Sequence, residues 1–337
     1  MLQPGYRNFG STQPYKKEIK LPFRKLNVYC SGLFLLITCP PFLIFFFFFT
    51  SQAQILTNYP GTLNENAISN NVFFSEKFIR QNKIKSVKVE ISFKRELQPI
   101  VKTGNSQGFE FNLKGKLVKQ FETILIGGNV KDTLVSFFIY NENNLLELKR
   151  SSDGNGFYSY YFDYDNAGNI IKQVYSRDEN KGNKNNFVMG RQFIISSETY
   201  QYEQLSVKQK RRKYFNDNGL EYKSVISSKN DYGNITEEES RFIVSDRKSR
   251  ISYKYDEYFR LIEKTDYSAI SGQNSIVSVF NYDDFGNLLQ EKISYNGKLK
   301  TTREFLYDNK TFLLDAQLIK DEATQTIQIY KYNYELE

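Results

Sequence analysis

A short pattern that recurs about every 25 residues constrains the fold of this chain more than any other feature. Its clearest copy is Ser278–Glu291, SVFNYDDFGNLLQE, which predicts a strand, a tight turn and a second strand. We use the acid or amide before each turn as the anchor of a copy. From Asn230 onward the anchors are 26, 27, 25 and 25 residues apart, which is typical of a repeat architecture. The anchors are Asn112, Asn141, Asp165, Asn216, Asn230, Asp256, Asp283, Asp308 and Asn333.

The residues around each anchor follow the two-residue period of a β-strand. Aromatic residues stand one and three positions before most anchors, and because side chains alternate across a strand, both rings of a pair face the same way. An aliphatic residue returns five positions after most anchors and begins the next strand. The aromatic pairs are Phe109/Phe111, Phe138/Tyr140, Phe162/Tyr164, Tyr253/Tyr255, Phe280/Tyr282, Phe305/Tyr307 and Tyr330/Tyr332.

The predicted turns carry residues that favour tight bends. Gly tolerates the positive φ that a hairpin turn often requires, and an Asp or Asn side chain accepts hydrogen bonds from the N–H groups of its own turn. Where Asn144, Phe259 or Thr311 replaces the Gly, we expect a different turn shape, since bulky and β-branched residues rarely adopt positive φ. The residues to which we assign structural roles in turns are Asp165, Gly168, Asn230, Gly233, Asp256, Asp283, Gly286 and Asp308.

Two copies of the repeat, Tyr164–Ile170 (YDNAGNI) and Tyr282–Leu288 (YDDFGNL), resemble the YD repeat of the RHS/YD-repeat family. The resemblance covers most of residues 109–337. Large members of that family form a shell of β-hairpins around a toxin domain. This chain is far shorter, and it looks more like the small exported YD-repeat proteins of Bacteroidota, whose functions are mostly unassigned.

The repeat predicts an all-β protein, an antiparallel meander of YD-type hairpins. Polar clusters between the anchored turns mark further strand boundaries and suggest about sixteen to eighteen strands. An open flat sheet of that size is unusual, so we expect the sheet to coil or to roll partly. A β-propeller with two repeats per blade is the alternative. One short N-terminal helix is expected within Phe73–Asn82, before a first strand in Lys83–Glu96.

The N-terminal segment has the order of a secretory signal peptide. Basic residues precede a nearly continuous apolar run, Gly32–Phe49, and Ser51 and Ala53 supply the small residues of a cleavage site after Ala53. An uncleaved anchor is the alternative, because the run is about long enough to span a bilayer. We expect residues 1–53 to be the signal peptide, residues 54–83 a flexible leader and short helix, and residues 84–337 a YD-like hairpin domain.

A transmembrane β-barrel would fit the strand count but not the polar pattern. Lipid-facing strands need apolar outer positions, whereas the positions between the aromatic residues include Asp163, Lys254, Asn281 and Lys331. We therefore expect no integral membrane domain after signal cleavage.

No pattern in the sequence specifies a reaction. The chain contains no His, the commonest acid–base residue. The carboxylates of Asp163, Asp165, Asp283 and Asp284 are neighbours on turns, whereas a glycosidase needs two that converge on a sugar ring. The run after Asp163 also lacks the bidentate Glu of a calcium loop. We therefore expect no enzyme, no catalytic residue, no cofactor and no metal site.

The charge pattern does not indicate a nucleic-acid partner. The chain has a formal net charge of +8, but part of this lies in the predicted signal peptide. The densest basic cluster, Lys208–Lys213 (KQKRRK), would alternate between the two faces of a strand, and lysines on edge strands commonly prevent aggregation.

The resulting hypothesis is an exported, non-catalytic β-repeat protein, a binding or structural scaffold in the periplasm, at the outer-membrane surface or outside the cell. Its partner would be a protein or a glycan of the envelope. A carbohydrate-binding or carbohydrate-active protein is the first alternative, suggested by 25 Tyr residues, although Trp is absent. The second is a relative of RHS shells linked to toxin delivery, which only the family resemblance implies.

Overall fold

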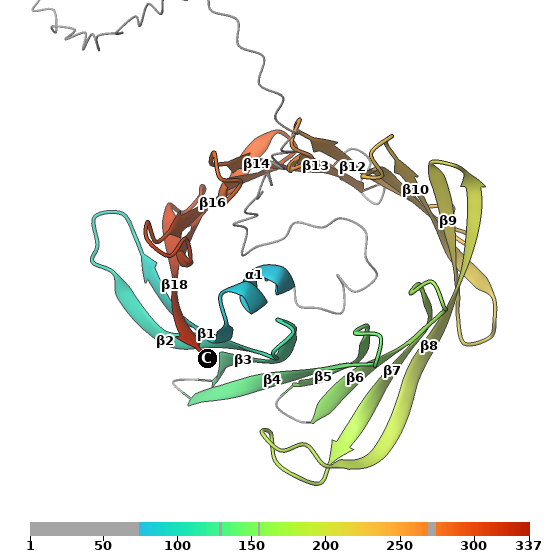
Figure 1. Cartoon of the computed structure of the whole chain (residues 1–337), viewed down its shortest axis with the longest axis horizontal. Coiled ribbons are helices and arrows are strands. Elements are labelled where there is room, and N and C mark those ends of the chain that lie inside the picture. The colour runs from blue at the N-terminus through green and yellow to red at the C-terminus, as the bar shows by residue number, and fades with distance from the viewer. Residues whose placement is uncertain (1–73, 128–129, 154–155, 269–273) are drawn as a thin grey trace, which may run out of the picture. The chain divides into compact units, whose positions relative to one another are not determined.

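The computed structural model describes residues 74–127, 130–153, 156–268 and 274–337, and the predicted signal peptide lies outside these ranges. One short helix, α1, precedes eighteen strands in this part of the chain (Figure 1). The elements are α1 (Glu76–Gln81), β1 (Ile84–Lys94), β2 (Val101–Phe111), β3 (Leu117–Gly127), β4 (Val130–Tyr140), β5 (Leu146–Ser152), β6 (Phe157–Tyr164), β7 (Ile170–Asn180), β8 (Met189–Ser206), β9 (Gln209–Phe215), β10 (Glu221–Lys229), β11 (Ile235–Phe242), β12 (Lys248–Tyr255), β13 (Leu261–Ser268), β14 (Asn274–Tyr282), β15 (Leu288–Tyr295), β16 (Lys298–Tyr307), β17 (Leu314–Asp321) and β18 (Thr326–Leu336).

The strands form one closed antiparallel barrel. Every strand pairs with its neighbour in sequence, and β1 also pairs with β18 over the register Ile84↔Leu336 to Lys94↔Ile327. The all-β class and the short helix agree with the sequence prediction. The coiled or partly rolled sheet is wrong, and so is the propeller alternative. The sheet closes into a barrel because β1, which lies outside the repeat, pairs with β2 on one side and with β18 on the other. Neither the first nor the last strand is therefore left with an unpaired edge.

The helix α1 lies inside the ring of strands (Figure 1). Phe78 and Ile79 of α1 belong to one buried cluster with side chains from β1, β2 and β12–β18, such as Val89, Phe305 and Tyr332. The face that carries this cluster is therefore the inner face of the barrel. A second inner cluster, around Phe138, Phe162 and Tyr200, continues the layer across β4–β10.

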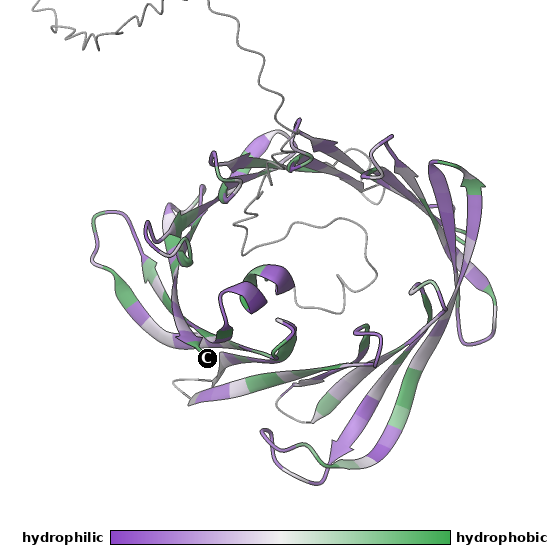
Figure 2. Cartoon of the chain, viewed as in Figure 1, coloured by the Kyte–Doolittle hydropathy of each residue, from purple (hydrophilic) through white to green (hydrophobic). Residues whose placement is uncertain are grey.

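The outer face is polar in many places. Asp163, Lys254, Asn281 and Lys331 are exposed, and Lys254 pairs with Glu263 of the next strand at 2.9 Å. Figure 2 shows hydrophobic and hydrophilic residues interspersed along the strands. In the described part of the chain, no helix is long and apolar enough to span a membrane.

The anchored turns share one hydrogen-bonding pattern. In the turn after β6, Asp165 Oδ1 accepts the N–H groups of Ala167 and Asn169 at 2.9 and 2.8 Å, and Gly168 has a φ of 80°. The side chains of Asn230, Asp256, Asp283 and Asp308 likewise accept N–H groups of their own turns, and the φ values of Gly233 and Gly286 are 86° and 88°.

Two of the turns without Gly do not change shape, contrary to our expectation. Asn144 and Phe259 adopt φ values of 59° and 62°, and each donates its N–H to the anchor's carbonyl as the Gly does elsewhere. The ring of Phe259 packs against that of Tyr232 from the preceding anchored turn, with centroids 4.7 Å apart. This contact offsets part of the backbone strain. The turn at Thr311 does differ, because the positive φ moves one residue on, to Phe312 at 57°.

Two anchors do not fit the repeat. Asn333 lies within β18, where it pairs with Lys88 of β1, and so does not begin a turn. Asn216 begins the turn between β9 and β10. Because the other anchored turns follow even-numbered strands and this one follows an odd-numbered strand, it lies at the opposite end of the barrel. The next anchor, Asn230, follows β10 and lies again at the same end as Asp165.

The repeat has a tyrosine just before most of its turns, and the hydrogen bond that each hydroxyl makes explains why the hydroxyl is kept. In seven places of the described chain, a Tyr hydroxyl donates to the carbonyl of the aliphatic residue that begins the preceding strand, at 2.6–3.0 Å. Each bond therefore joins one anchored hairpin to the hairpin beside it in the barrel. The pairs are Tyr140 and Leu117, Tyr164 and Leu146, Tyr202 and Ile170, Tyr255 and Ile235, Tyr282 and Leu261, Tyr307 and Leu288, and Tyr334 and Leu314.

Candidate binding wall inside the barrel

The inner face of β6–β10 carries a group of tyrosines beside charged side chains, which we call the tyrosine wall. Strand alternation and register place these residues on the same face as Phe162. A barrel of about eighteen strands is too wide for the side chains of its own wall to fill. Residues of the inner face can therefore contact a ligand. The wall consists of Tyr158, Tyr160, Tyr175, Arg177, Glu198, Tyr200, Arg212, Tyr214, Tyr222 and Lys223.

The half-buried part of the wall is a stack of three rings. Tyr175 lies between Tyr160 and Tyr158, with centroid distances of 4.6 and 5.6 Å and interplanar angles of 19° and 20°. The guanidinium of Arg177 covers Tyr158 at 4.3 Å, and Arg177 Nη1 is held by Asp153 at 2.7 Å. The order of the stack is therefore Tyr160, Tyr175, Tyr158 and Arg177.

Two hydroxyls of this stack are available for a ligand. Within the described part of the chain, the hydroxyls of Tyr160 and Tyr175 have no hydrogen-bond partner, although both residues are half-buried. Burial raises the pKa of each above its ordinary value, so both are neutral donors at physiological pH. A half-buried hydroxyl without a partner gains a bond when a polar ligand approaches.

The buried part of the wall is centred on Glu198. Its carboxylate accepts the hydroxyls of Tyr200 and Tyr222, both at 2.8 Å. Burial, followed by the charge of Glu198, raises the pKa of Tyr200. The ring of Tyr214 packs edge-on against Tyr200 at 5.2 Å. Because these hydroxyls are already paired, this part fixes the shape of the wall and leaves recognition to the ring stack.

Two cations border the tyrosines on the β9–β10 side. Lys223 Nζ lies over the ring of Tyr214 at 4.9 Å, and the Arg212 guanidinium lies over the same ring at 5.0 Å. Burial lowers the pKa of Lys223, and the nearby charge of Arg212 lowers it further. The wall therefore presents positive charge at one side and the carboxylate of Glu198 within it, a mixed pattern that does not select strongly for an anion.

The turn residues singled out in the sequence do not belong to this wall. All of these residues lie in turns between strands, and the Asp and Asn side chains accept hydrogen bonds from N–H groups of their own turns. They are Asp165, Gly168, Asn230, Gly233, Asp256, Asp283, Gly286 and Asp308. The residues to which we assigned structural roles in turns are thus dispersed around one end of the barrel. In the residues that the structure describes, no group of three or more acidic, Cys or His side chains could hold a metal ion.

The wall residues carried a weak signal in the sequence. Tyr158 and Tyr160 stand seven and five positions before Asp165, so they extend the aromatic alternation of Phe162 and Tyr164 away from the turn. Glu198 and Lys223 carried no signal, because neither stands at an anchor or at an aromatic position of the repeat. Only the pairing of β7 with β8, and of β9 with β10, brings these side chains to the tyrosines.

These observations define the protein as a closed antiparallel β-barrel with an internal helix and a tyrosine-rich inner wall. No family model matches the sequence, and no curated protein matches it. Among solved structures, a porin-like protein from Bacteroides uniformis is similar with a TM-score of 0.35 and 9% identity, covering 75% of this chain and 97% of that one.

Two further solved structures show comparable likeness. A porin-like protein from Bacteroides vulgatus has a TM-score of 0.32 and 10% identity, covering 75% of this chain and 98% of that one. The structure of TcdB2-TccC3-TEV has a TM-score of 0.23 and 12% identity, covering 67% of this chain and 15% of that one. Likeness at these scores carries no argument about function, and membership of the RHS/YD-repeat family stays a prediction.

Proposed function

We propose that this chain is an exported, non-catalytic binding protein of the cell envelope or the cell exterior, and that its ligand contacts the tyrosine wall. The observation that carries the proposal is the half-buried ring stack on the inner face, with two hydroxyls that lack partners in the described chain. The signal-like N-terminal segment supports export. The polar outer face supports a location outside the hydrocarbon of a membrane.

A glycan suits the wall better than a protein partner does. The ring faces of Tyr175 are taken up by Tyr160 and Tyr158, so the wall offers ring edges and hydroxyl groups to a ligand. A sugar presents a dense array of hydroxyls that can pair with such donors and with Arg177. Because charges of both signs border the tyrosines, we favour a neutral glycan over a strongly anionic one.

A glycan array probed with the wild-type protein and with two variants tests this function. We expect Tyr175→Ala to weaken binding about tenfold or more, since it removes the middle ring of the stack. The matched control is Tyr267→Ala, which removes a tyrosine that is 41% exposed on the outer face and should leave binding unchanged. Equal binding by all three proteins, or no binding to any glycan or envelope protein, would contradict the proposal.

The non-catalytic part needs its own measurement. Each glycan that binds is incubated with the protein and analysed by mass spectrometry, and we expect it to be recovered intact. Cleavage that disappears on Asp165→Asn or Asp283→Asn alone would show that a turn carboxylate is catalytic and that the proposed function is wrong.

A further inference from the structure

One strand of the barrel exposes an edge that no described strand covers. The strand β8 has 18 residues. It pairs with β7 from Met189 to Thr199, but β9 pairs with it only from Thr199 onward. The segment Met189–Glu198 therefore has a bonded edge toward β7 and a free edge on its other side. Figure 1 shows this hairpin of β7 and β8 extending outward beyond the ring of strands.

The free edge is apolar and well suited to strand pairing. Phe193, Ile194 and Ile195 are 52%, 66% and 50% exposed. Exposed edges are templates for pairing with another strand, and proteins usually block them with Lys, Pro or a covering loop. The segment MGRQFIISSE contains no Lys and no Pro. Its ladder ends where Asp217, from the turn after β9, accepts the N–H of Ser197.

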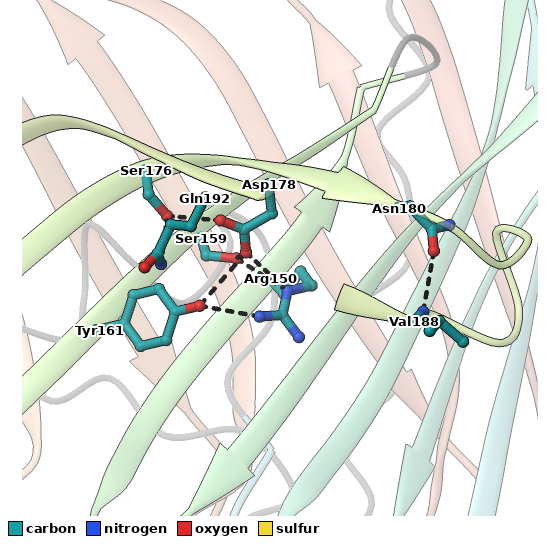
Figure 3. Close-up of polar contacts among 8 residues, drawn as sticks. All are labelled: Arg150, Ser159, Tyr161, Ser176, Asp178, Asn180, Val188 and Gln192. Atoms are coloured by element: carbon teal, nitrogen blue, oxygen red, sulfur yellow. Dashed lines mark hydrogen bonds and ion pairs between the residues drawn. The ribbon is translucent and has the colours of Figure 1, made fainter. Parts of the chain in front are cut away.

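A buried polar network holds this hairpin rigid. Asp178 of β7 is 1% exposed and accepts hydrogen bonds from Arg150 Nε at 3.0 Å and from Ser176 Oγ at 2.8 Å (Figure 3). Gln192 of β8 donates to the same Ser176 hydroxyl at 3.2 Å, so β8 is tied to β7 through its side chain as well as its backbone. Breaking such a buried ion pair is costly, and the network therefore keeps β8 extended.

The loop between β7 and β8 is also fixed. Asn180 Oδ1 accepts the N–H groups of Gly182 and Val188, both at 2.9 Å, which closes the loop at its base. Lys184 forms an ion pair with Asp132 of β4, and the ring of Phe187 packs edge-on against Phe157 at 5.0 Å. Because the buried network and the loop contacts hold this edge in place beforehand, the edge loses little conformational entropy when it gains a partner.

We propose that the free edge of β8 binds the same edge of a second copy of this chain, so that two barrels form a two-fold dimer through a continuous antiparallel sheet. A two-fold axis perpendicular to a strand pairs the edge of that strand with the same edge of its copy in antiparallel direction. With the axis at Ile194, Phe193 of one copy lies opposite Ile195 of the other, which covers the exposed apolar residues of both.

The charges at the ends of the edge complement this register. The same axis places Arg191 of one copy opposite Ser197 of the other, where Asp217 closes the edge. Each dimer would thus have two such Arg191–Asp217 approaches, one at each end of the shared ladder. Arg191 is 78% exposed in its side chain and is paired with Glu179 at 3.3 Å, so it can reach toward a second carboxylate.

Sedimentation velocity over a range of concentrations tests the dimer. We expect wild type to sediment as a dimer that dissociates on dilution, and Ile194→Lys to weaken the association about tenfold or more, because a charge on an edge opposes pairing. The control is Val244→Lys, at a residue that is 92% exposed in the turn after β11, which should dimerise as wild type does.

Cross-linking tests the register. Because the axis at Ile194 brings the two Ile194 side chains together, I194C should form a disulfide-linked dimer on mild oxidation, whereas V244C should not. A wild-type monomer at all concentrations overturns the proposal, as does a dimer that Ile194→Lys leaves intact. An edge that pairs only with an added extended peptide, and never with a second copy, also overturns it. None of these outcomes depends on ligand binding at the tyrosine wall.

Discussion

Phe259 stands at a positive φ that the same turn elsewhere gives to Gly. A left-handed conformation costs a residue with a Cβ about 1–2 kcal/mol, and the ring contact with Tyr232 compensates for part of this cost. Gly233 is the simpler case, because its φ is 86° and a Cβ added there would meet nothing within 4 Å. Any cost of substitution at Gly233 is therefore backbone strain and not a clash.

Substitutions at Gly233 should separate strain from packing. We expect Gly233→Val to lower the free energy of unfolding by about 1–2 kcal/mol, since a β-branched residue is forced into positive φ. Gly233→Asn should cost much less, because Asn enters this region more readily. Urea unfolding followed by circular dichroism measures both. Equal stabilities for the two variants would show that the turn relaxes to another shape.

At the residue scale, the sequence predicted hydrogen bonds within a turn. It did not predict contacts between turns that offset backbone strain. The bonds from Asp165 to its own turn follow from the side chain alone. The positive φ of Phe259 depends on Tyr232, which lies in the preceding anchored turn, and no local rule predicts that contact.

The hairpins are joined to one another by the tyrosine hydroxyls described above. Tyr307 shows the arrangement clearly: its hydroxyl reaches the Leu288 carbonyl at 3.0 Å, and its ring lies against the inner cluster with α1. The bond crosses from β16 to the first residue of β15. Each hydroxyl of this kind therefore couples neighbouring repeats that are only marginally stable alone.

Removing one such hydroxyl should weaken the barrel without changing its fold. We expect Tyr307→Phe to lower the free energy of unfolding by about 0.5–1.5 kcal/mol, the usual net value of one hydrogen bond. Tyr232→Phe is the control, since Tyr232 is 75% exposed at a turn. Thermal unfolding by calorimetry gives both values, and a control that loses as much stability as Tyr307→Phe would contradict the role of the hydroxyl.

The element pattern was predictable where the repeat is regular and not where it changes. The aromatic alternation before Asp283 predicts β14, and the structure has that strand ending at Tyr282. In contrast, β8 contains Phe193, Ile194 and Ile195 in direct succession, which hides the two-residue period. That run is the segment with the free edge, so the irregularity in the sequence has a structural counterpart.

Closure of the barrel depends on one strand outside the repeat. β1 carries Val87 and Val89 to the inner face, where they are 1% and 0% exposed, while Lys88 and Glu90 point outward. The alternation of apolar and polar residues in β1 predicted a strand, but no feature of the sequence indicated which strands β1 pairs with. The pairing with β18 joins residues about 250 apart in the chain, as in the bond from Lys85 to Glu335. A repeat period defines nearest neighbours only, so the closed form could not be derived from it.

The buried tyrosines around the whole barrel make its stability sensitive to alkali. Burial raises the pKa of Tyr307, Tyr332 and Tyr334 above the value of about 10 that an unfolded chain would show, and it raises that of Tyr255 to about 12. Because the folded pKa values exceed the unfolded ones, the stabilisation is complete below pH of about 10 and is lost as pH rises toward the folded values. We expect the melting temperature to be steady near neutral pH and to fall steeply above pH of about 10.

Absorbance of tyrosinate near 295 nm should then rise in two stages, first for exposed tyrosines and later together with loss of the β-sheet circular dichroism signal. A single stage, with the β-sheet signal retained throughout, would show that these rings are accessible to hydroxide in the folded barrel.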